Sequence, residues 1–291
     1  MIPPAMAQAL GHVLISGAST GIGRACAVRL AGAGFHVFAG VRSDQAAAEV
    51  AGPNITAIKL DVTDAGMIAC AAKSITETVG TAGLAGLVNN AGISVHGPVE
   101  HIPLSEWRRQ FDTNFFGQIA MTQAMLPLLR QHVATAGMGS ARIVMMSSIA
   151  GLIAQPIIGP YNASKYALEA ISDSLRMELR PQGIRVCLVN PGAIDTPIWG
   201  KAEANPGAFP PDHPARALYG KAIEGVLKSA RKCAEYAIPA DVVARAVEAC
   251  MTRRRPRTRY LVGSDARVGA VAKRLLPTAI MDAGICWALK A

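Results

Sequence analysis

"SGASTGIGRA" (residues 16–25) overlaps the end of the apolar run "HVLIS" (12–16) and opens a segment with helical periodicity. Glycines at 17, 21 and 23 let the backbone turn sharply and approach a ligand closely. The free N–H groups at the start of a helix favour an anion such as a pyrophosphate. A glycine pattern alone is a weak signal, but its place after a first strand strengthens it, so we predict a dinucleotide-binding turn.

Around this turn, short β-branched runs alternate with longer helical patterns. Strands that are almost entirely apolar, separated by helices, indicate a parallel sheet covered on both faces. The predicted fold is therefore α/β: a single-domain, Rossmann-like, doubly wound sheet of seven mostly parallel strands with helices on both faces. The predicted strands are 12–16, 35–40, 55–60, 85–89, 141–146, 184–189 and 259–262.

The chain has 291 residues, 51% of them hydrophobic, which suffices for one large core, and it contains no repeat or low-complexity linker. We expect a single domain over 1–291. "EANPGAFPPDHPAR" (203–216) is predicted to be an insertion loop. The expected parts are an N-terminal extension (1–11), a dinucleotide-binding and catalytic core (12–199), a substrate lid (197–232) and a C-terminal tail (265–291).

Composition narrows the function class. The N-terminus lacks a charged n-region and no window of 18 residues is apolar without a charge, so we predict neither a signal peptide nor a transmembrane segment, and expect a cytoplasmic protein. Six scattered cysteines without a C-x-x-C pair or a neighbouring His argue against disulfides and against a metal site.

The net charge of +9 is concentrated near the C-terminus: residues 228–291 hold 13 Lys/Arg and 5 Asp/Glu, against 16 and 15 in the first 227. We interpret the cluster "RRRPRTR" (253–259) as solvated residues that complement a helix end. Contact with phosphates or anionic lipid remains an alternative, and no nucleic acid is expected.

"YNASK" (161–165) places a phenol and an ammonium four residues apart. The segment 159–180 is helical by pattern, so Tyr161 and Lys165 share one face of a helix. In the helix before it, Ser105 is a predicted N-terminal cap. Such a pair alone is common on a solvated surface. Its meaning comes from the other motifs, which together resemble the short-chain dehydrogenase/reductase family over 12–199: "SGASTGIG", "NNAG" (89–92), Asn114, Ser148 thirteen residues before Tyr161, and "YNASK".

The resemblance implies a strand order of 3-2-1-4-5-6-7, with the dinucleotide at the carboxyl ends of the strands. It also implies four catalytic residues. Tyr161 would be the acid/base, and the positive charge of Lys165 would favour its phenolate. Ser148 would hydrogen-bond the substrate oxygen. Lys165 would also hold the nicotinamide ribose, and Asn114 would link Lys165 to solvent through a water.

The predicted cofactor contacts follow from the same motifs. A helix cap at Asp61 and an ordinary turn at Pro191 and Gly192 remain alternatives. "GVRS" (40–43) has Val41 and Arg42 where an acid would bind a 2′-hydroxyl, so we predict NADP(H) over NAD(H), although Arg42 pointing into water or stacking on adenine stays open. The predicted cofactor-binding residues are Gly17, Ser19, Thr20, Gly21, Ile22, Gly23, Arg42, Asp61, Val62, Asn90, Ala91, Gly92, Tyr161, Lys165, Pro191, Gly192 and Thr196.

The predicted substrate contacts are mostly apolar and suggest a lipophilic alcohol or ketone. The layout resembles the retinol and 17β-hydroxysteroid dehydrogenase branch, which implies a steroid- or retinoid-like substrate; a 3-oxoacyl-thioester reductase is the alternative within the family. A non-catalytic dinucleotide sensor would be expected to lack Tyr161 or Lys165. The predicted substrate residues are Val95, Ser148, Ile149, Ala193, Ile198 and Trp199.

The tail 267–290 mixes apolar and basic residues without reaching the length of a membrane span. We expect it to pack as part of the lid or to form a subunit contact, with peripheral membrane contact as the alternative. The family resemblance further implies a homodimer or homotetramer packed through the helices that carry Asn114 and Tyr161.

Overall fold

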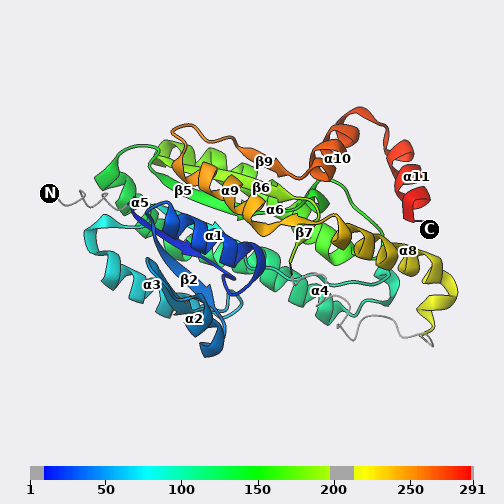
Figure 1. Cartoon of the computed structure of the whole chain (residues 1–291), viewed down its shortest axis with the longest axis horizontal. Coiled ribbons are helices and arrows are strands. Elements are labelled where there is room, and N and C mark those ends of the chain that lie inside the picture. Colours follow the sequence, from blue (N-terminus) through cyan, green and yellow to red (C-terminus); the bar gives the residue numbers. More distant parts are fainter. Residues whose placement is uncertain (1–9, 197–212, 290–291) are drawn as a thin grey trace.

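The computed structural model describes residues 10–196 and 213–289. Its main sheet (Figure 1) has seven strands, each within two residues of the predicted bounds. These strands are β1 (His12–Ile15), β2 (His36–Val41), β3 (Ile55–Lys59), β4 (Gly86–Asn89), β5 (Ala141–Met146), β6 (Ile184–Pro191) and β9 (Arg259–Val262). Their order is β3-β2-β1-β4-β5-β6-β9 and every neighbouring pair is parallel, which confirms the predicted fold class.

A second, two-stranded sheet was not predicted. It pairs β7 (Ile194–Asp195) with β8 (Ile238–Pro239) in parallel, just after the end of β6. Strands of two residues carry no hydrophobic periodicity, so the sequence pattern gave no sign of them.

The helices alternate with the strands as predicted, and α6 coincides with the predicted helix 159–180 to within one residue. A π-helical turn, η3 (Asp112–Phe116), joins α4 to α5, and a short 3₁₀ turn, η4 (Ile149–Gly151), follows β5. The helices are α1 (Gly21–Gly32), α2 (Asp44–Val50), α3 (Ala65–Val79), α4 (Leu104–Phe111), α5 (Gly117–Ala136), α6 (Gly159–Leu179), α8 (Ala215–Glu235), α9 (Ala240–Thr252), α10 (Ser264–Leu275) and α11 (Thr278–Leu289).

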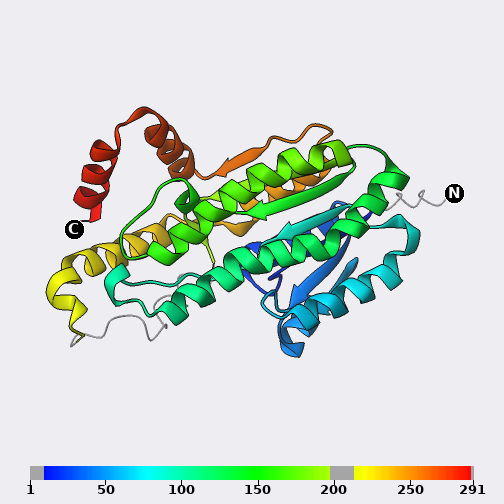
Figure 2. The ribbon, with the colours of Figure 1, turned by 180° about the vertical axis from the view of Figure 1, so that it is seen from behind.

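Two separate cores lie on the two faces of the sheet. Successive side chains of a strand point to opposite faces, so Val13 and Ile15 pack with α1, α2 and α9, whereas Leu14 packs with α3, α5 and α6. Figures 1 and 2 show these two helical layers from opposite sides. Because both faces are covered, the strands are apolar at nearly every position, which is why the sequence read as uninterrupted apolar runs.

The C-terminal helices α10 and α11 form an arm that projects from the edge of the molecule and returns towards α8 (Figure 1). The arm is anchored at its start, where the Ala193 N–H donates to the Asp265 carboxylate at 2.7 Å. Among the helices of residues 10–196 and 213–289, none is long and apolar enough to cross a membrane.

One predicted helix start was wrong. Ser105 lies inside α4, which begins at Leu104 after Pro103 and has no side-chain cap. Pro103 takes the N-cap position, and its carbonyl accepts from the N–H groups of Glu106 and Trp107, so Ser105 falls inside the first turn. The predicted loop 203–216 also ends earlier than expected, because α8 starts at Ala215; residues 203–212 lie outside the described part of the chain.

Candidate active site

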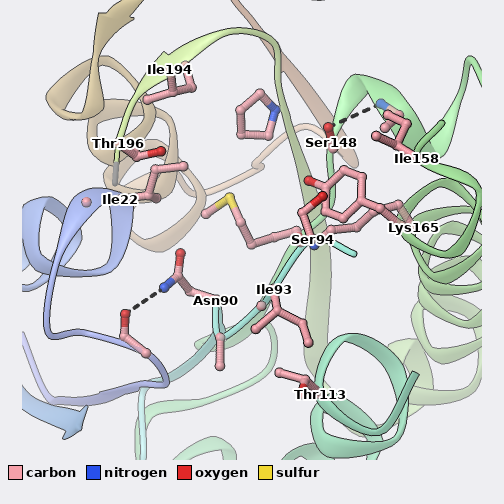
Figure 3. Close-up of a pocket in the computed structure, with 18 of the residues that line it drawn as sticks. Ile22, Asn90, Ile93, Ser94, Thr113, Ser148, Ile158, Lys165, Ile194 and Thr196 are labelled. Atoms are coloured by element: carbon pink, nitrogen blue, oxygen red, sulfur yellow. Dashed lines mark hydrogen bonds between the residues drawn. The ribbon is translucent and has the colours of Figure 1, made fainter. Parts of the chain in front are cut away.

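A cavity of about 1640 Å³ lies along the carboxyl edge of the main sheet. Pockets for one small ligand usually measure roughly 300–1,000 Å³. The wall runs from the glycine turn at Gly17 past Ser148 and Tyr161 to Leu289 of the arm. Figure 3 shows Ile22, Asn90 and Thr196 on one side and Ser148 and Lys165 on the other. The volume therefore suffices for two molecules side by side.

The glycine turn and the loop after β4 form one unit. The Ser16 hydroxyl accepts hydrogen bonds from the N–H groups of Asn90 at 3.0 Å and Ala91 at 3.1 Å. In return, the Asn90 side-chain amide donates to the carbonyls of Ser16 and Gly17, both at 3.0 Å. Gly17 has a φ of +64°, and a Cβ there would lie 2.8 Å from Ala91 Cα. The close approach of the two loops thus requires glycine at this position.

Helix α1 presents an uncapped N-terminus to the cavity. Thr20 precedes the helix in an extended conformation, makes no side-chain cap, and is followed by a first turn without acidic residues. By contrast, α2 and α3 are capped by the side chains of Ser43 and Asp64. Since Ser19 to Gly23 line the cavity, the unpaired N–H groups and the positive end of the α1 dipole fit a ligand phosphate.

The ends of β2 and β3 bring a cation and a restrained carboxylate to the cavity. Arg42 and Asp61 both line it. Burial by itself would raise the pKa of Asp61, but the hydrogen bonds from the Thr63 N–H and hydroxyl, with the charge of Arg42, outweigh burial and lower this pKa. Asp61 is not a helix cap, because Asp64 caps α3. The first acid after Arg42, Asp44, pairs with Lys59 at 3.1 Å.

Tyr161 and Lys165 meet on the inner face of α6, as their spacing predicted. The Lys165 Nζ lies 5.7 Å from the centroid of the Tyr161 ring and donates to the Met146 carbonyl at 2.7 Å. Burial lowers the pKa of Lys165 to about 8, although the nearby Glu169 carboxylate opposes the shift. Burial raises the pKa of Tyr161, while a hydrogen bond with Ser148 lowers it. At neutral pH the pair is therefore a protonated phenol beside a buried ammonium.

Ser148 stands two residues after the end of β5, at the N-cap of η4. Its hydroxyl oxygen accepts a hydrogen bond from the Ala150 N–H at 3.1 Å (Figure 3). Because this bond occupies only a lone pair, the Ser148 hydroxyl can still donate its proton, either to Tyr161 or to a substrate oxygen in the cavity.

Asn114 lies in the π-helical turn η3 and is fully buried behind the cavity wall. Its side-chain oxygen accepts from the Ile93 N–H at 2.8 Å, and its amide donates to the Ile93 carbonyl at 3.0 Å and to the Ser164 hydroxyl at 3.3 Å. Asn114 thus ties the loop after β4 to α6 next to Lys165. π-turns inside helices are frequent at functional sites. Its link to Lys165 through a water stays a prediction.

All the residues predicted to contact a cofactor line this cavity, and so do the predicted substrate residues Ser148, Ile149 and Ala193. Val95 does not. It is 2% exposed, and its N–H donates to the Gln110 side chain at 2.7 Å, so the residue is held in the interior. Ile198 and Trp199 lie outside the described residues.

Several lining residues were missed by sequence analysis. His96, next to Val95, lines the cavity and shares a hydrogen bond of 2.7 Å with the Ser94 hydroxyl. Burial lowers the pKa of His96, so its ring is neutral at pH 7. Met281, Ile285 and Leu289 of α11 also line the cavity. Their spacing of four residues is a helical stripe, a signal that the tail sequence did contain.

Comparison with known proteins agrees with this geometry. The family model of the short chain dehydrogenases matches residues 11–207. The NADPH-dependent 3-dehydrocapnine reductase of Ornithobacterium rhinotracheale is 33% identical over 93% of this chain and 94% of its own. Human retinol dehydrogenase 5 is 34% identical over 95% of this chain and 88% of its own.

The solved structure of a short-chain dehydrogenase from Streptomyces avermitilis aligns with 98% of this chain and 98% of its own, with a TM-score of 0.76 and 28% sequence identity. The match extends over the sheet, the glycine turn and the Tyr161 helix. The protein therefore belongs to the short-chain dehydrogenase family and is an oxidoreductase that acts on alcohol or carbonyl groups.

Proposed function

We propose that this protein transfers a hydride between NADP(H) and a lipophilic alcohol or ketone. The observation that carries the proposal is the meeting of the Tyr161 phenol, the Lys165 ammonium and the Ser148 hydroxyl on a cavity whose other end is the glycine turn. Proton transfer at an oxygen needs such a group beside the site of hydride transfer.

The residues present fit a nicotinamide dinucleotide. The turn at Gly17 and the uncapped start of α1 suit a pyrophosphate, and the cavity exceeds the volume of one small molecule. Lys165 would hold the nicotinamide ribose hydroxyls, and Pro191, Gly192 and Thr196 would contact the nicotinamide end. When bound, the cofactor supplies or accepts the hydride.

In carbonyl reduction, Ser148 donates a hydrogen bond to the substrate oxygen and fixes its position. Tyr161 gives its hydroxyl proton to that oxygen, and the charge of Lys165 stabilises the phenolate that remains. Alcohol oxidation runs the same proton path backwards. Since the Met146 carbonyl and the packing around Lys165 fix the ammonium, its charge acts on Tyr161 without prior rearrangement.

NADP(H) is preferred over NAD(H) because Arg42, rather than an acid, follows β2 at the cavity wall. A guanidinium pairs with a 2′-phosphate through charge-assisted hydrogen bonds. One relative that covers nearly the whole chain is named as NADPH-dependent.

A lipophilic substrate is supported by the apolar wall beyond Tyr161, which includes Ile149, Ile153 and Val226 in addition to the α11 stripe. A steroid- or retinoid-like alcohol or ketone would cover this wall with its apolar body, which supports such a substrate over a short 3-oxoacyl thioester.

The test is a spectrophotometric screen of steroids, retinoids, acetoacetyl thioesters and simple ketones with NADPH and NADH. Tyr161→Phe keeps the ring and removes the proton, so we expect turnover to fall by at least ~10²-fold while cofactor binding remains. Tyr236→Phe is the control, because Tyr236 is 74% exposed. Near-normal turnover in folded Tyr161→Phe protein contradicts the mechanism.

We also propose that two copies pack through α4, η3 and α6, as the family resemblance implies. Large apolar side chains are exposed along this surface: Leu104 is 69% exposed, Phe116 55% and Met177 65%. A contact between two copies through these elements would cover such exposed apolar side chains. Analytical ultracentrifugation of Phe116→Glu protein tests the contact, and an unchanged oligomer mass would refute it.

A further inference from the structure

Glu169 is a buried carboxylate that the mechanism above does not use. It lies on α6 one turn after Lys165 and two turns after Tyr161, so the three side chains share the inner face of the helix. The residue is 7% exposed. A buried ionised carboxylate is costly unless it is paired and hydrogen-bonded, so its partners indicate why it is there.

The first partner is Arg259, at the start of β9. Its guanidinium donates to one carboxylate oxygen of Glu169 from Nη2 at 2.5 Å and from Nε at 3.1 Å. The basic cluster 253–259 was predicted to face water, but this arginine turns inward. Arg259 compensates the Glu169 charge through these two charge-assisted hydrogen bonds.

The second partner is Asn190, a fully buried residue of β6. Its side-chain amide donates to the other oxygen of Glu169 at 2.5 Å and to the Ser148 carbonyl at 3.1 Å. The carboxylate therefore determines the orientation of an amide that holds the backbone of Ser148. Arg259, Glu169, Asn190 and Ser148 form one continuous chain of hydrogen bonds from β9 to the cavity.

Packing reinforces this chain. The turn η4, which begins after Ser148, lies directly on α6 at Gly151: a Cβ there would be 3.0 Å from the Lys165 carbonyl and 3.1 Å from Glu169 Cγ. On the other side of Ser148, the Lys165 ammonium holds the Met146 carbonyl. The Ser148 backbone is thus fixed from α6 on both sides, by Lys165 and by Glu169 through Asn190.

We propose that Glu169 is a positioning residue of the active site, which orients Ser148 through Asn190 and maintains the positive charge of Lys165. The inference rests on the proposed function, because it assigns Glu169 to the same Ser148, Tyr161 and Lys165. Glu169 does not line the cavity and acts only through these neighbours.

The charged groups around Lys165 and Glu169 are few. Helix α6 contributes Tyr161 and also Asp173, whose carboxylate pairs with Arg176 on the same helix and lies 3.8 Å from Arg259. Strand β9 contributes Arg259, and β6 faces Glu169 with the uncharged Asn190, while Cys187 packs in the core on the opposite face of the sheet. Glu169 is the charged group whose field raises the pKa of Lys165 against burial.

The decisive variant is Glu169→Gln, which keeps the size of the side chain and removes the charge. In the free protein, carbon-13 NMR of the lysine Cε atoms, with the Lys165 signal identified by its loss in Lys165→Met, should show Lys165 titrating at a lower pH than in wild type. The high-pH loss of kcat/KM for carbonyl reduction should move to lower pH with it. Glu178→Gln, on an exposed part of the same helix, is the matched control and should change neither.

Two further variants separate charge from position. Glu169→Asp keeps the charge and should restore the wild-type pH profile. Asn190→Ala removes the amide that holds Ser148, so kcat should fall roughly ten- to a hundredfold with the pH profile unmoved. If Glu169 had only a structural role, Glu169→Gln would lower the melting temperature but would change neither the Lys165 titration nor the pH profile of kcat/KM.

Wild-type titration of Lys165 and a wild-type pH profile in folded Glu169→Gln protein would overturn the inference. If that variant does not fold, an unchanged kcat in Asn190→Ala overturns it. Failure of the proposed function is distinguishable, because it would appear as full activity in Tyr161→Phe or as no activity of wild type with any substrate, whereas the NMR titration needs neither substrate nor cofactor.

Discussion

Two effects act on the charge of Lys165 in opposite directions. Its charge favours the Tyr161 phenolate, but the residue is only 4% exposed, and burial disfavours the charged form. The Met146 carbonyl and the Glu169 carboxylate offset part of this cost. The folded protein therefore holds the Lys165 ammonium at a net cost in free energy, and in the proposed mechanism this charge assists proton transfer.

The cost of burying this ammonium predicts that the stability of the folded protein depends on pH. The pKa of Lys165 is lowered from 10.5 to about 8. Between these values the unfolded chain binds more protons than the folded chain, so folding becomes more favourable as pH rises from 8 to 10.5. Relative to Lys165→Met, wild type should gain up to about 3 kcal/mol over this range.

Urea denaturation at a series of pH values measures this difference. Lys73→Met, at an exposed position of α3, is the control and should follow wild type. A constant difference between wild type and Lys165→Met would show that Lys165 titrates alike in both states.

Cofactor choice is the second prediction at this scale. If Arg42 pairs with a 2′-phosphate, Arg42→Ala should weaken NADPH binding roughly ten- to a hundredfold and leave NADH binding nearly unchanged. Val41→Asp should shift preference towards NADH, because a carboxylate accepts from the 2′-hydroxyl and repels the phosphate. Calorimetric titration measures both, and equal weakening of the two cofactors by Arg42→Ala would exclude this role.

The motif residues were predictable together, from their order and spacing along the chain, whereas the residues of the substrate wall were not. Tyr161, Lys165 and Ser148 are set by fixed spacings on one helix and one strand end. Val95 and His96 sit side by side in a loop, and which of them faces the cavity depends on a bond between the Val95 N–H and Gln110, fifteen residues away. No local pattern encodes such a contact.

At the level of elements, the unit formed by β1, the glycine turn and the loop after β4 depends on one hydroxyl. Ser16 is fully buried and accepts from two backbone N–H groups. Ser16→Ala should therefore lower the free energy of unfolding by about 1–3 kcal/mol, since buried donors lose their partner. It should also weaken binding of both nicotinamide cofactors, because Asn90 and Ala91 line the cavity.

Ser16→Thr is the matched control, since it keeps the hydroxyl. Guanidinium denaturation and fluorescence titration with NADPH measure the two effects. Equal stability of the alanine and threonine variants would show that the hydroxyl does not hold the two loops together.

The main elements were predictable because strands covered on both faces are buried along their whole length and therefore form apolar runs in the sequence. In β5, for example, all six residues are buried. Small features escaped prediction. The pairing of β7 with β8 joins residues more than forty positions apart through two-residue strands, and the start of α4 is set by Pro103 rather than by a capping side chain. Both depend on tertiary context more than on local preference.

On the scale of the whole molecule, the arm forms part of the cavity wall. Met281, Ile285 and Leu289 line the inside, whereas Ile280 and Trp287 on the same helix are 55% and 83% exposed. Ending the chain at Leu276 removes α11 and keeps the Asp265 anchor. Losing the contact of even one large apolar side chain costs about 1.5–3 kcal/mol, so KM for a bulky apolar substrate should rise roughly tenfold or more.

Turnover of a small ketone should be nearly unaffected by this truncation, which makes it the internal control. Liposome flotation and ultracentrifugation of the full-length and truncated proteins test whether a membrane surface or a second subunit covers the outer face of α11. Unchanged KM for every substrate would show that the arm does not contact the substrate.

The placement of β9 also has a consequence for synthesis. Strand β6 ends at Pro191, yet its outer neighbour begins only at Arg259, after α8 and α9. At roughly 5–20 residues per second, a ribosome leaves the β6 edge without a partner for several seconds. An open apolar strand edge is a template for pairing with another nascent chain. Variants that weaken β9 should therefore reduce the yield of native protein from translation more than they reduce the stability of molecules that have already folded.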